Sequence, residues 1–135
     1  MNILLFGKTG QVGWELQRAL APLGNLIALD VHSTDYCGDF SNPEGVAETV
    51  RSIRPDIIVN AAAHTAVDKA ESEPKFAQLL NATSVEAIAK AANEVGAWVI
   101  HYSTDYVFPG TGEIPWLETD ATAPLNVYGE TKLSG

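Results

Sequence analysis

The sequence predicts a Rossmann-like α/β fold, in which a doubly wound parallel sheet carries helices on both faces. Short runs that are apolar throughout alternate with longer segments whose apolar residues recur at helical spacing. A glycine-rich loop joins the first of these runs to the first helical segment. The 135 residues are enough for one domain with a buried core, so we expect residues 1–135 to form a single domain.

The expected elements follow one another in a regular order. Strands are predicted over four apolar runs, at residues 3–6, 26–29, 57–59 and 98–102. Helices are predicted over residues 11–23, from residue 43, over 76–95, and from about residue 125 to the end of the sequence. Asn42 is a capping side chain before a first-turn proline, and Gly96 ends the third helix. Prolines and glycines make 108–124 a long loop.

Charge and cysteine content exclude several classes of protein. The formal charge is −9 with no basic patch, so the backbone of a nucleic acid is not an expected partner. No apolar stretch reaches the roughly 18 residues that cross a bilayer, so no membrane association is expected. Cys37 is the only cysteine and has no partner for an internal disulfide. Because no secretory leader is recognisable either, we expect a cytoplasmic protein.

The glycine loop predicts a site for a dinucleotide. Gly7, Gly10 and Gly13 lie between the first strand and the first helix, together with Gln11 and Val12. Glycines allow the tight turn and the close approach of a pyrophosphate, and the helix N-terminus offers unpaired N–H groups to the phosphates. A glycine turn without a ligand is the alternative. A P-loop is excluded, because that motif needs another glycine five residues before Gly7.

Asp30 ends the second predicted strand and is a candidate ligand of the adenosine ribose. A carboxylate there accepts hydrogen bonds from the ribose hydroxyls and repels a 2′-phosphate, which favours NADH. Lys8 and His32 lie nearby in the expected fold and reduce that repulsion, so NADPH stays open as well. The alternative is a solvated aspartate at a strand end.

Tyr128 and Lys132 are the candidate catalytic pair, because side chains four residues apart share one face of a helix. A phenol can protonate a carbonyl oxygen that is being reduced, and a neighbouring ammonium favours the phenolate that results. Thr104 follows the fourth strand, where ligands gather in this architecture, and its hydroxyl can stabilise the developing oxyanion. Ser103 is the alternative, since adjacent strand residues point to opposite sides.

The motifs in this order resemble the extended short-chain dehydrogenases/reductases, and within them the dTDP-4-dehydrorhamnose reductases. The narrower resemblance rests on four stretches: MNILLFGKTGQVGWE at 1–15, NAAAHTAVD at 60–68, YSTDYVF at 102–108 and NVYG at 126–129. It implies reduction of dTDP-4-dehydro-6-deoxy-L-mannose to dTDP-L-rhamnose by NADPH or NADH, for cell-surface polysaccharide.

The resemblance also assigns roles to individual residues. It gives the catalytic roles to Thr104, Tyr128 and Lys132, and substrate contacts to Asp105 and Tyr106. The further cofactor contacts that it implies are Asp39 and Phe40 beside the adenine, Ala61, Ala62 and Ala63 along the cofactor path, and Thr65 beside the ribose. Some members of the family carry Mg²⁺, for which Glu15 is a candidate ligand, although the sequence shows no metal-ligand spacing.

The sequence departs from this family in length, since it stops shortly after Lys132 and lacks the family's C-terminal substrate-binding part. Either it is a fragment or the gene product is truncated, and we expect weak or absent turnover with residual cofactor binding. A non-catalytic cofactor-binding or regulatory module is the alternative function. A sheet edge left open by the missing part favours self-association, with a homodimer as one form.

A few residues are expected to have ordinary roles. We expect His101 to be structural, Trp14 and Trp98 to be packed, and Glu71 and Glu73 to lie in an exposed first helical turn. Trp116 lies in the long loop, where it is either packed or covers a sugar.

Overall fold

Four parallel strands form one sheet in the computed structural model, which describes residues 1–135. The strands are β1 (Asn2–Phe6), β2 (Asn25–Leu29), β3 (Ile57–Asn60) and β4 (Trp98–His101). Their order in the sheet is β2-β1-β3-β4, so the chain first extends the sheet to one side of β1 and then to the other. The Rossmann-like fold predicted from the alternating pattern is confirmed, and β4 ends at His101, one residue earlier than expected.

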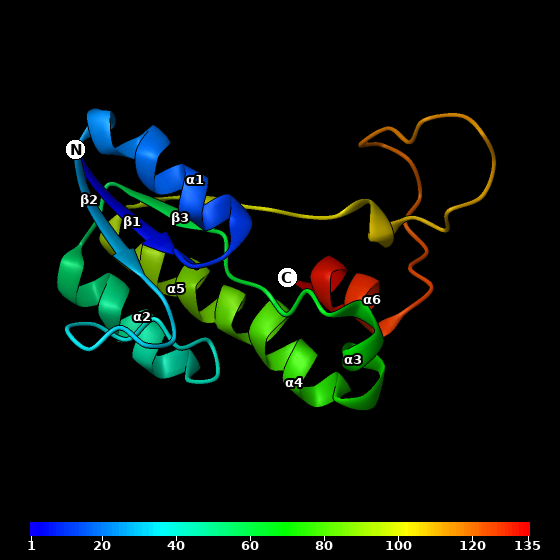
Figure 1. Ribbon diagram of the computed structural model, residues 1–135, viewed down its shortest axis with the longest axis horizontal. Coiled ribbons are helices and arrows are strands. Elements are labelled where there is room, and N and C mark those ends of the chain that lie inside the picture. The colour runs from blue at the N-terminus through cyan, green and yellow to red at the C-terminus, as the bar shows by residue number, and fades with distance from the viewer.

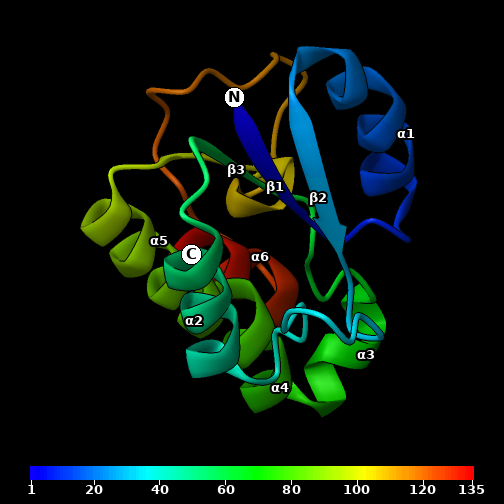
Figure 2. The same cartoon turned by 90° about the vertical axis from the view of Figure 1, so that its left-hand side faces the viewer.

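Helices cover both faces of the sheet. Figure 1 shows α1 (Gln11–Leu20) on one face and α2 (Pro43–Ile53) with α5 (Ser84–Val95) on the other, and Figure 2 shows the same three layers from the end of the sheet. Consecutive residues of β1 and β3 point to opposite faces. The larger core therefore joins Leu4, Phe6 and Ile58 to α2 and α5, and the smaller one places Ile3, Leu5 and Val59 beneath α1.

The helical stretch after β3 is longer and more broken than the sequence predicted. It comprises α3 (Val67–Ser72), α4 (Pro74–Gln78), the π-turn η2 (Leu79–Thr83) and α5. The expected helix over 76–95 corresponds to most of α4, η2 and α5, and Gly96 ends it with a positive φ of 76°. The expectation missed α3, because six residues are too few to show helical periodicity.

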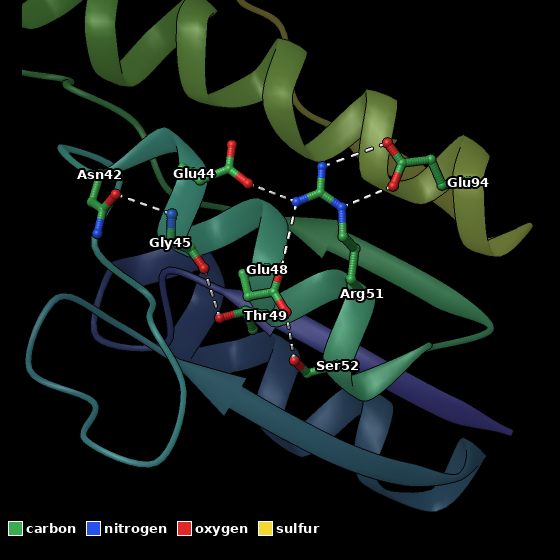
Figure 3. A network of polar contacts seen from close by, with 8 residues as sticks. All are labelled: Asn42, Glu44, Gly45, Glu48, Thr49, Arg51, Ser52 and Glu94. Atoms are coloured by element: carbon green, nitrogen blue, oxygen red, sulfur yellow. Dashed lines mark hydrogen bonds and ion pairs between the residues drawn. The ribbon is translucent and has the colours of Figure 1, made fainter.

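Polar contacts join α2 to α5 (Figure 3). The predicted cap is present, since the Asn42 side chain accepts the N–H of Gly45 at 3.0 Å. Arg51 donates to Glu44 of its own helix and to Glu94 of α5, each at 2.8 Å. The guanidinium lowers the pKa of Glu94 by hydrogen bonding. This ion pair links the two helices that cover the larger core.

The remaining elements are short. A 3₁₀ turn η1 (Ala21–Leu23) follows α1, a second 3₁₀ turn η3 (Asp105–Val107) follows β4, and α6 (Val127–Ser134) lies near the C-terminus after the expected long loop (Figure 1). None of the helices combines the length and the apolar character that crossing a bilayer requires.

The expectation that Trp14 and Trp98 are packed is wrong. Trp14 is 69% exposed on α1, and Trp98 is 80% exposed on β4. Trp98 pairs in register with Ile57 and Ile100 with Val59, so both side chains face the side of the sheet that carries α1. The exposure of Trp98 and Ile100 shows that α1 leaves the β4 end of that face uncovered.

Candidate functional site

The glycine loop has the shape of a cradle against the loop that follows β3. Gly7 has a φ of +87°, and a Cβ on it would lie 2.7 Å from backbone atoms of Ala61 and Ala62. A Cβ on Gly13 would lie 1.9 Å from the carbonyl oxygen of Gly7. Packing therefore requires glycine at both positions. A Cβ on Gly10 would meet nothing closer than 3.6 Å, so packing does not explain the glycine at that position.

The N-terminus of α1 is open to a ligand. Gly10 is its N-cap and offers no side-chain acceptor, so the first-turn N–H groups at residues 11–13 have no capping side chain. This helix end lies beside the loops that follow β1 and β3, where the direction of strand addition reverses. Open α/β sheets bind ligands at that point. A cradle that excludes Cβ atoms, next to unpaired N–H groups, fits the pyrophosphate of a dinucleotide.

Asp30 is partly committed to its own turn. It is 7% exposed, and its Oδ1 accepts the N–H of His32 at 3.0 Å and the hydroxyl of Ser33 at 3.2 Å. Oδ2 accepts no hydrogen bond from the protein and is the oxygen left for a ribose hydroxyl. Lys8 approaches from the glycine loop, with Nζ 3.3 Å from the Ser33 hydroxyl. Lys8, His32, Ser33 and Asp35 line a cavity of about 470 Å³ beside β2.

Asp39 and Phe40 differ in what they expose. The Phe40 ring is buried and packs edge-on against Phe6, with ring centroids 5.3 Å apart. The Asp39 carboxylate accepts the N–H of Ser41 at 2.8 Å and so shapes the turn before α2. The Phe40 ring is therefore part of the core, and its carbonyl accepts the Ser84 hydroxyl at 2.6 Å.

The helix α6 is attached to the fold at both of its ends. Asn126 caps it by accepting the N–H of Gly129 at 2.7 Å, and Glu71 of α3 accepts the N–H of Val127 at 2.8 Å. Lys132 is only 6% exposed, and its Nζ donates to the carbonyl of Tyr102 at 2.6 Å. Burial lowers the pKa of Lys132. The helix that carries Tyr128 and Lys132 is thereby held against the segment after β4.

In the segment after β4, Thr104 lies two residues from each of two contacts with α6, at Tyr102 and at Tyr106. The Tyr128 ring packs edge-on against Tyr106, with centroids 5.5 Å apart, while Lys132 bonds to Tyr102. The Thr104 hydroxyl accepts the N–H of Tyr106 at 3.2 Å and donates to Asp105 at 3.3 Å. Its proton can turn from the exposed Asp105 to a carbonyl oxygen of a substrate.

A cavity of about 790 Å³ adjoins this segment. Ser103, Thr104 and Asp105 line it, together with Phe108 and Trp116 of the long loop. The rings of Phe108 and Trp116 are stacked, with centroids 5.1 Å apart and planes within 2°. Ser103 and Thr104 both line the cavity, so Ser103 stays the alternative hydroxyl. No lysine, arginine or histidine lines it, whereas Asp105 and Glu118 both do.

The sequence analysis missed Asn81, which connects the loop after β3 to α6. Asn81 lies in η2 and is 1% exposed. Its Oδ1 accepts the N–H of His64 at 2.7 Å, and its Nδ2 donates to the carbonyl of His64 and to the hydroxyl of Thr131. Nothing in the sequence distinguishes this asparagine from one on a helix surface, because its neighbours come together only in the fold.

Glu71 is exposed as expected, but neither Glu71 nor Glu73 lies in a first helical turn. Glu71 lies in the last turn of α3 and caps α6. Glu73 accepts a hydrogen bond from His64 Nε2 at 2.6 Å, and this bond lowers the pKa of Glu73. His64 is buried, so this pair fixes the loop that holds Ala63 and Thr65.

The structure gives no support to a magnesium site. No group of three or more His, Cys, Asp or Glu side chains lies close enough together to hold a metal ion. Glu15, the candidate ligand, pairs instead with Arg18 at 2.8 Å on the exposed surface of α1.

Comparison with known proteins identifies the family. The model of the family described as "RmlD substrate binding domain" matches residues 1–135. The chain belongs to this family. The dTDP-4-dehydrorhamnose reductase of Escherichia coli K12 is 95% identical over all 135 residues, which are 45% of its own length. The chain therefore spans less than half the length of this RmlD relative.

Solved structures agree with the RmlD assignment. A dTDP-4-dehydrorhamnose reductase from Clostridium acetobutylicum superposes with a TM-score of 0.91 at 38% identity, over 99% of this chain and 47% of that one. The reductase from Bacillus anthracis, solved in complex with NADP, gives 0.89 at 36% identity, over 98% of this chain and 46% of that one. The predicted family resemblance is confirmed by these matches.

Proposed function

We propose that this chain provides the cofactor site and the proton donor for reduction of dTDP-4-dehydro-6-deoxy-L-mannose to dTDP-L-rhamnose by NADPH or NADH. The observation that carries the proposal is the attachment of α6 to the segment after β4. It brings Tyr128 against Tyr106 and Lys132 against Tyr102, on either side of Thr104. The similar reductases and the NADP complex of one of them support the proposal.

Different residues of the chain bind the cofactor, orient the substrate and transfer the proton. Gly7, Gly10 and the helix end at 11–13 hold the pyrophosphate, with Ala61–63 and Thr65 along the path toward the catalytic residues. A bound nicotinamide supplies the hydride. Thr104 donates a hydrogen bond to the substrate oxygen, and Tyr128 transfers its phenolic proton to that oxygen as negative charge develops. Lys132 stabilises the phenolate that Tyr128 becomes.

The turn at the end of β2 supports the use of both cofactors. Asp30 Oδ2 can accept a hydrogen bond from the adenosine ribose of NADH, which has a free 2′-hydroxyl. The Lys8 ammonium, 3.3 Å from the Ser33 hydroxyl of the same turn, offers a counter-charge for the 2′-phosphate of NADPH. We propose dual use on these grounds, and the cytoplasm stays the predicted location.

The cavity beside Thr104 explains why weak turnover is expected. A dTDP-sugar carries a diphosphate, and protein sites for such groups use cations or backbone N–H groups. The cavity offers Asp105 and Glu118 and no cationic side chain. We therefore propose that this chain binds the cofactor well and the sugar nucleotide poorly. The same observation supports the second candidate, a non-catalytic cofactor-binding or regulatory module.

One pair of measurements tests the proposal and separates the two candidates. Calorimetric titration with NADPH and with NADH should show binding of both. A reductase assay with the dTDP-4-keto sugar should show turnover that is low but abolished by Tyr128→Phe. Cofactor binding with no turnover at any substrate concentration favours the non-catalytic module. Absence of cofactor binding contradicts both candidates.

A further inference from the structure

His101 and Asn60 form a hydrogen-bonded pair at the carboxyl ends of neighbouring strands. They are partners in the register of β3 and β4, and Asn60 is 2% exposed. The Asn60 Nδ2 lies 3.0 Å from His101 Nδ1. The Asn60 Oδ1 accepts the N–H of Ala62 at 3.0 Å. The pair therefore reaches from β4 into the turn at Ala61–63, against which Gly7 packs.

The chemistry of the three groups fixes which atom carries each proton. The Ala62 N–H can only donate, so the amide oxygen of Asn60 must face it. The amide nitrogen then faces His101 and can also only donate. His101 Nδ1 must accept, which places the ring proton on Nε2 and keeps the imidazole neutral. A proton on Nδ1 would set two donors against each other, and turning the amide over would leave the Ala62 N–H facing another donor.

The surroundings of His101 favour the same state. Burial lowers the pKa of His101 to about 4, and the Lys132 cation on α6 contributes to the shift. Nε2 is buried and has no hydrogen-bond partner, so no acceptor there stabilises a charged imidazolium. The strands β3 and β4 are already joined by backbone pairing. The Nδ2–Nδ1 contact and the Oδ1–Ala62 contact are therefore not needed to hold the sheet together.

We infer that His101 is a positioning residue for the cofactor turn: through Nδ1 it orients the Asn60 amide, and the amide holds the backbone of Ala62. The role toward the cofactor rests on the proposed function. His101 does not touch the reacting atoms. It determines the direction in which Asn60 presents its oxygen, and hence the course of the turn that closes the cradle opposite Gly7.

Three variants distinguish positioning from packing. His101→Leu removes the acceptor and leaves the Asn60 Nδ2 unpaired, which should weaken NADPH binding about five-fold or more. His101→Asn keeps an acceptor near the position of Nδ1 and should bind NADPH within about two-fold of the unaltered chain. Trp98→Leu is the control on the same strand, because its side chain is exposed and should leave the affinity unchanged.

Nuclear magnetic resonance of the imidazole provides a readout that packing would not move. Long-range ¹H–¹⁵N spectra should show the proton of His101 on Nε2, with Nδ1 unprotonated at neutral pH. Asn60→Asp places a carboxylate oxygen against Nδ1, so the pKa of His101 should rise and the imidazolium should appear at neutral pH. A proton on Nδ1 in the unaltered chain overturns the inference.

The binding results separate this inference from the proposed function. If the unaltered chain binds NADPH and His101→Leu binds it equally well, the positioning role is refuted and the proposed function stands. If the unaltered chain binds neither NADPH nor NADH, the proposed function is refuted, together with the role of His101 toward the cofactor. Weaker binding by His101→Leu with recovery in His101→Asn supports both.

Discussion

The ammonium of Lys132 donates to the backbone carbonyl of Tyr102 at 2.6 Å, which attaches α6 to the segment that follows β4. A buried lysine loses hydration, and the lowered pKa of Lys132 reflects that loss. The carbonyl replaces part of the lost solvent and sets the position of the charge. Tyr128 lies one turn earlier on the same helix, and its ring packs edge-on against Tyr106 of that segment.

Tyr128→Phe should separate chemistry from binding. The change removes the phenolic proton and keeps the ring that packs against Tyr106. Introduced at the corresponding position of a full-length relative, it should lower kcat by about 10²-fold or more, in the range typical of a lost general acid. The Kd for NADPH should change by less than about three-fold. An unchanged kcat would remove Tyr128 as the proton donor.

Gly10→Ala should weaken cofactor binding, whereas Gly13→Ala should lower the stability of the fold. The Gly13 Cβ would collide with the Gly7 carbonyl, so Gly13→Ala should lower the melting temperature clearly. The Gly10 Cβ has room and Gly10 has an ordinary φ of −72°, so Gly10→Ala should fold normally. If the pyrophosphate passes over Gly10, the affinity for NADPH should still fall about ten-fold or more. Scanning calorimetry measures the melting temperature, and titration calorimetry measures the affinity for NADPH. Full cofactor affinity in Gly10→Ala would place the phosphates elsewhere.

Lys8→Met should change the preference between the two cofactors. Loss of a charge-assisted contact with phosphate should raise the ratio of the Kd for NADPH to the Kd for NADH by about ten-fold. Lys75→Met is a matched control, because it removes the same charge from α4, at a distance in sequence from the turn after β2. Adenosine 2′,5′-bisphosphate and adenosine 5′-monophosphate repeat the comparison without the nicotinamide. A ratio that changes no more in Lys8→Met than in Lys75→Met would assign the 2′-phosphate to other groups.

The sequence was sufficient for features that depend on local chemistry. The glycine spacing, the cap at Asn42 and the helix stop at Gly96 are each determined by a few neighbouring residues, and the structure has the cap and the stop as expected. The contacts of Asn81, Glu71 and Glu73 join segments between 9 and 56 residues apart, so no local pattern reveals them. The exposure of Trp98 depends on how far α1 extends across the sheet, which hydropathy cannot show.

Asn81→Ala should destabilise the fold more than any surface change on the same helical stretch. It leaves the N–H and the carbonyl of His64 without their side-chain partner, and it removes the hydrogen bond that the Thr131 hydroxyl accepts, all at a buried position. A loss of about 2–4 kcal/mol in the free energy of unfolding is expected from such a buried network. Asn93→Ala, at an exposed position of α5, is the control and should change it by less than about 0.5 kcal/mol.

Urea unfolding followed by circular dichroism measures both asparagine variants. The loss in Asn81→Ala should come with weaker attachment of α6, seen as faster amide exchange in residues 127–134. Equal stability of the two variants would mean that the buried hydrogen bonds of Asn81 contribute no more to the free energy of unfolding than the exposed side chain of Asn93 does.

The chain should associate with itself through β4. This strand is at the edge of the sheet and pairs only with β3, so its outer backbone groups have no strand partner. Trp98 and Ile100 add exposed apolar surface beside that edge. Open edges and apolar patches both promote pairing between chains. We therefore expect the apparent mass in analytical ultracentrifugation to rise with protein concentration.

Trp98→Lys tests whether that surface is responsible. A lysine at an edge strand opposes pairing by charge and removes the largest apolar side chain of the patch. The substitution should shift association to several-fold higher concentration and leave the melting temperature almost unchanged, because Trp98 is 80% exposed. Ile114→Lys makes a comparable change at an 85% exposed position in the long loop, away from the sheet. If both variants associate as the unaltered chain does, the contact between copies lies on another surface.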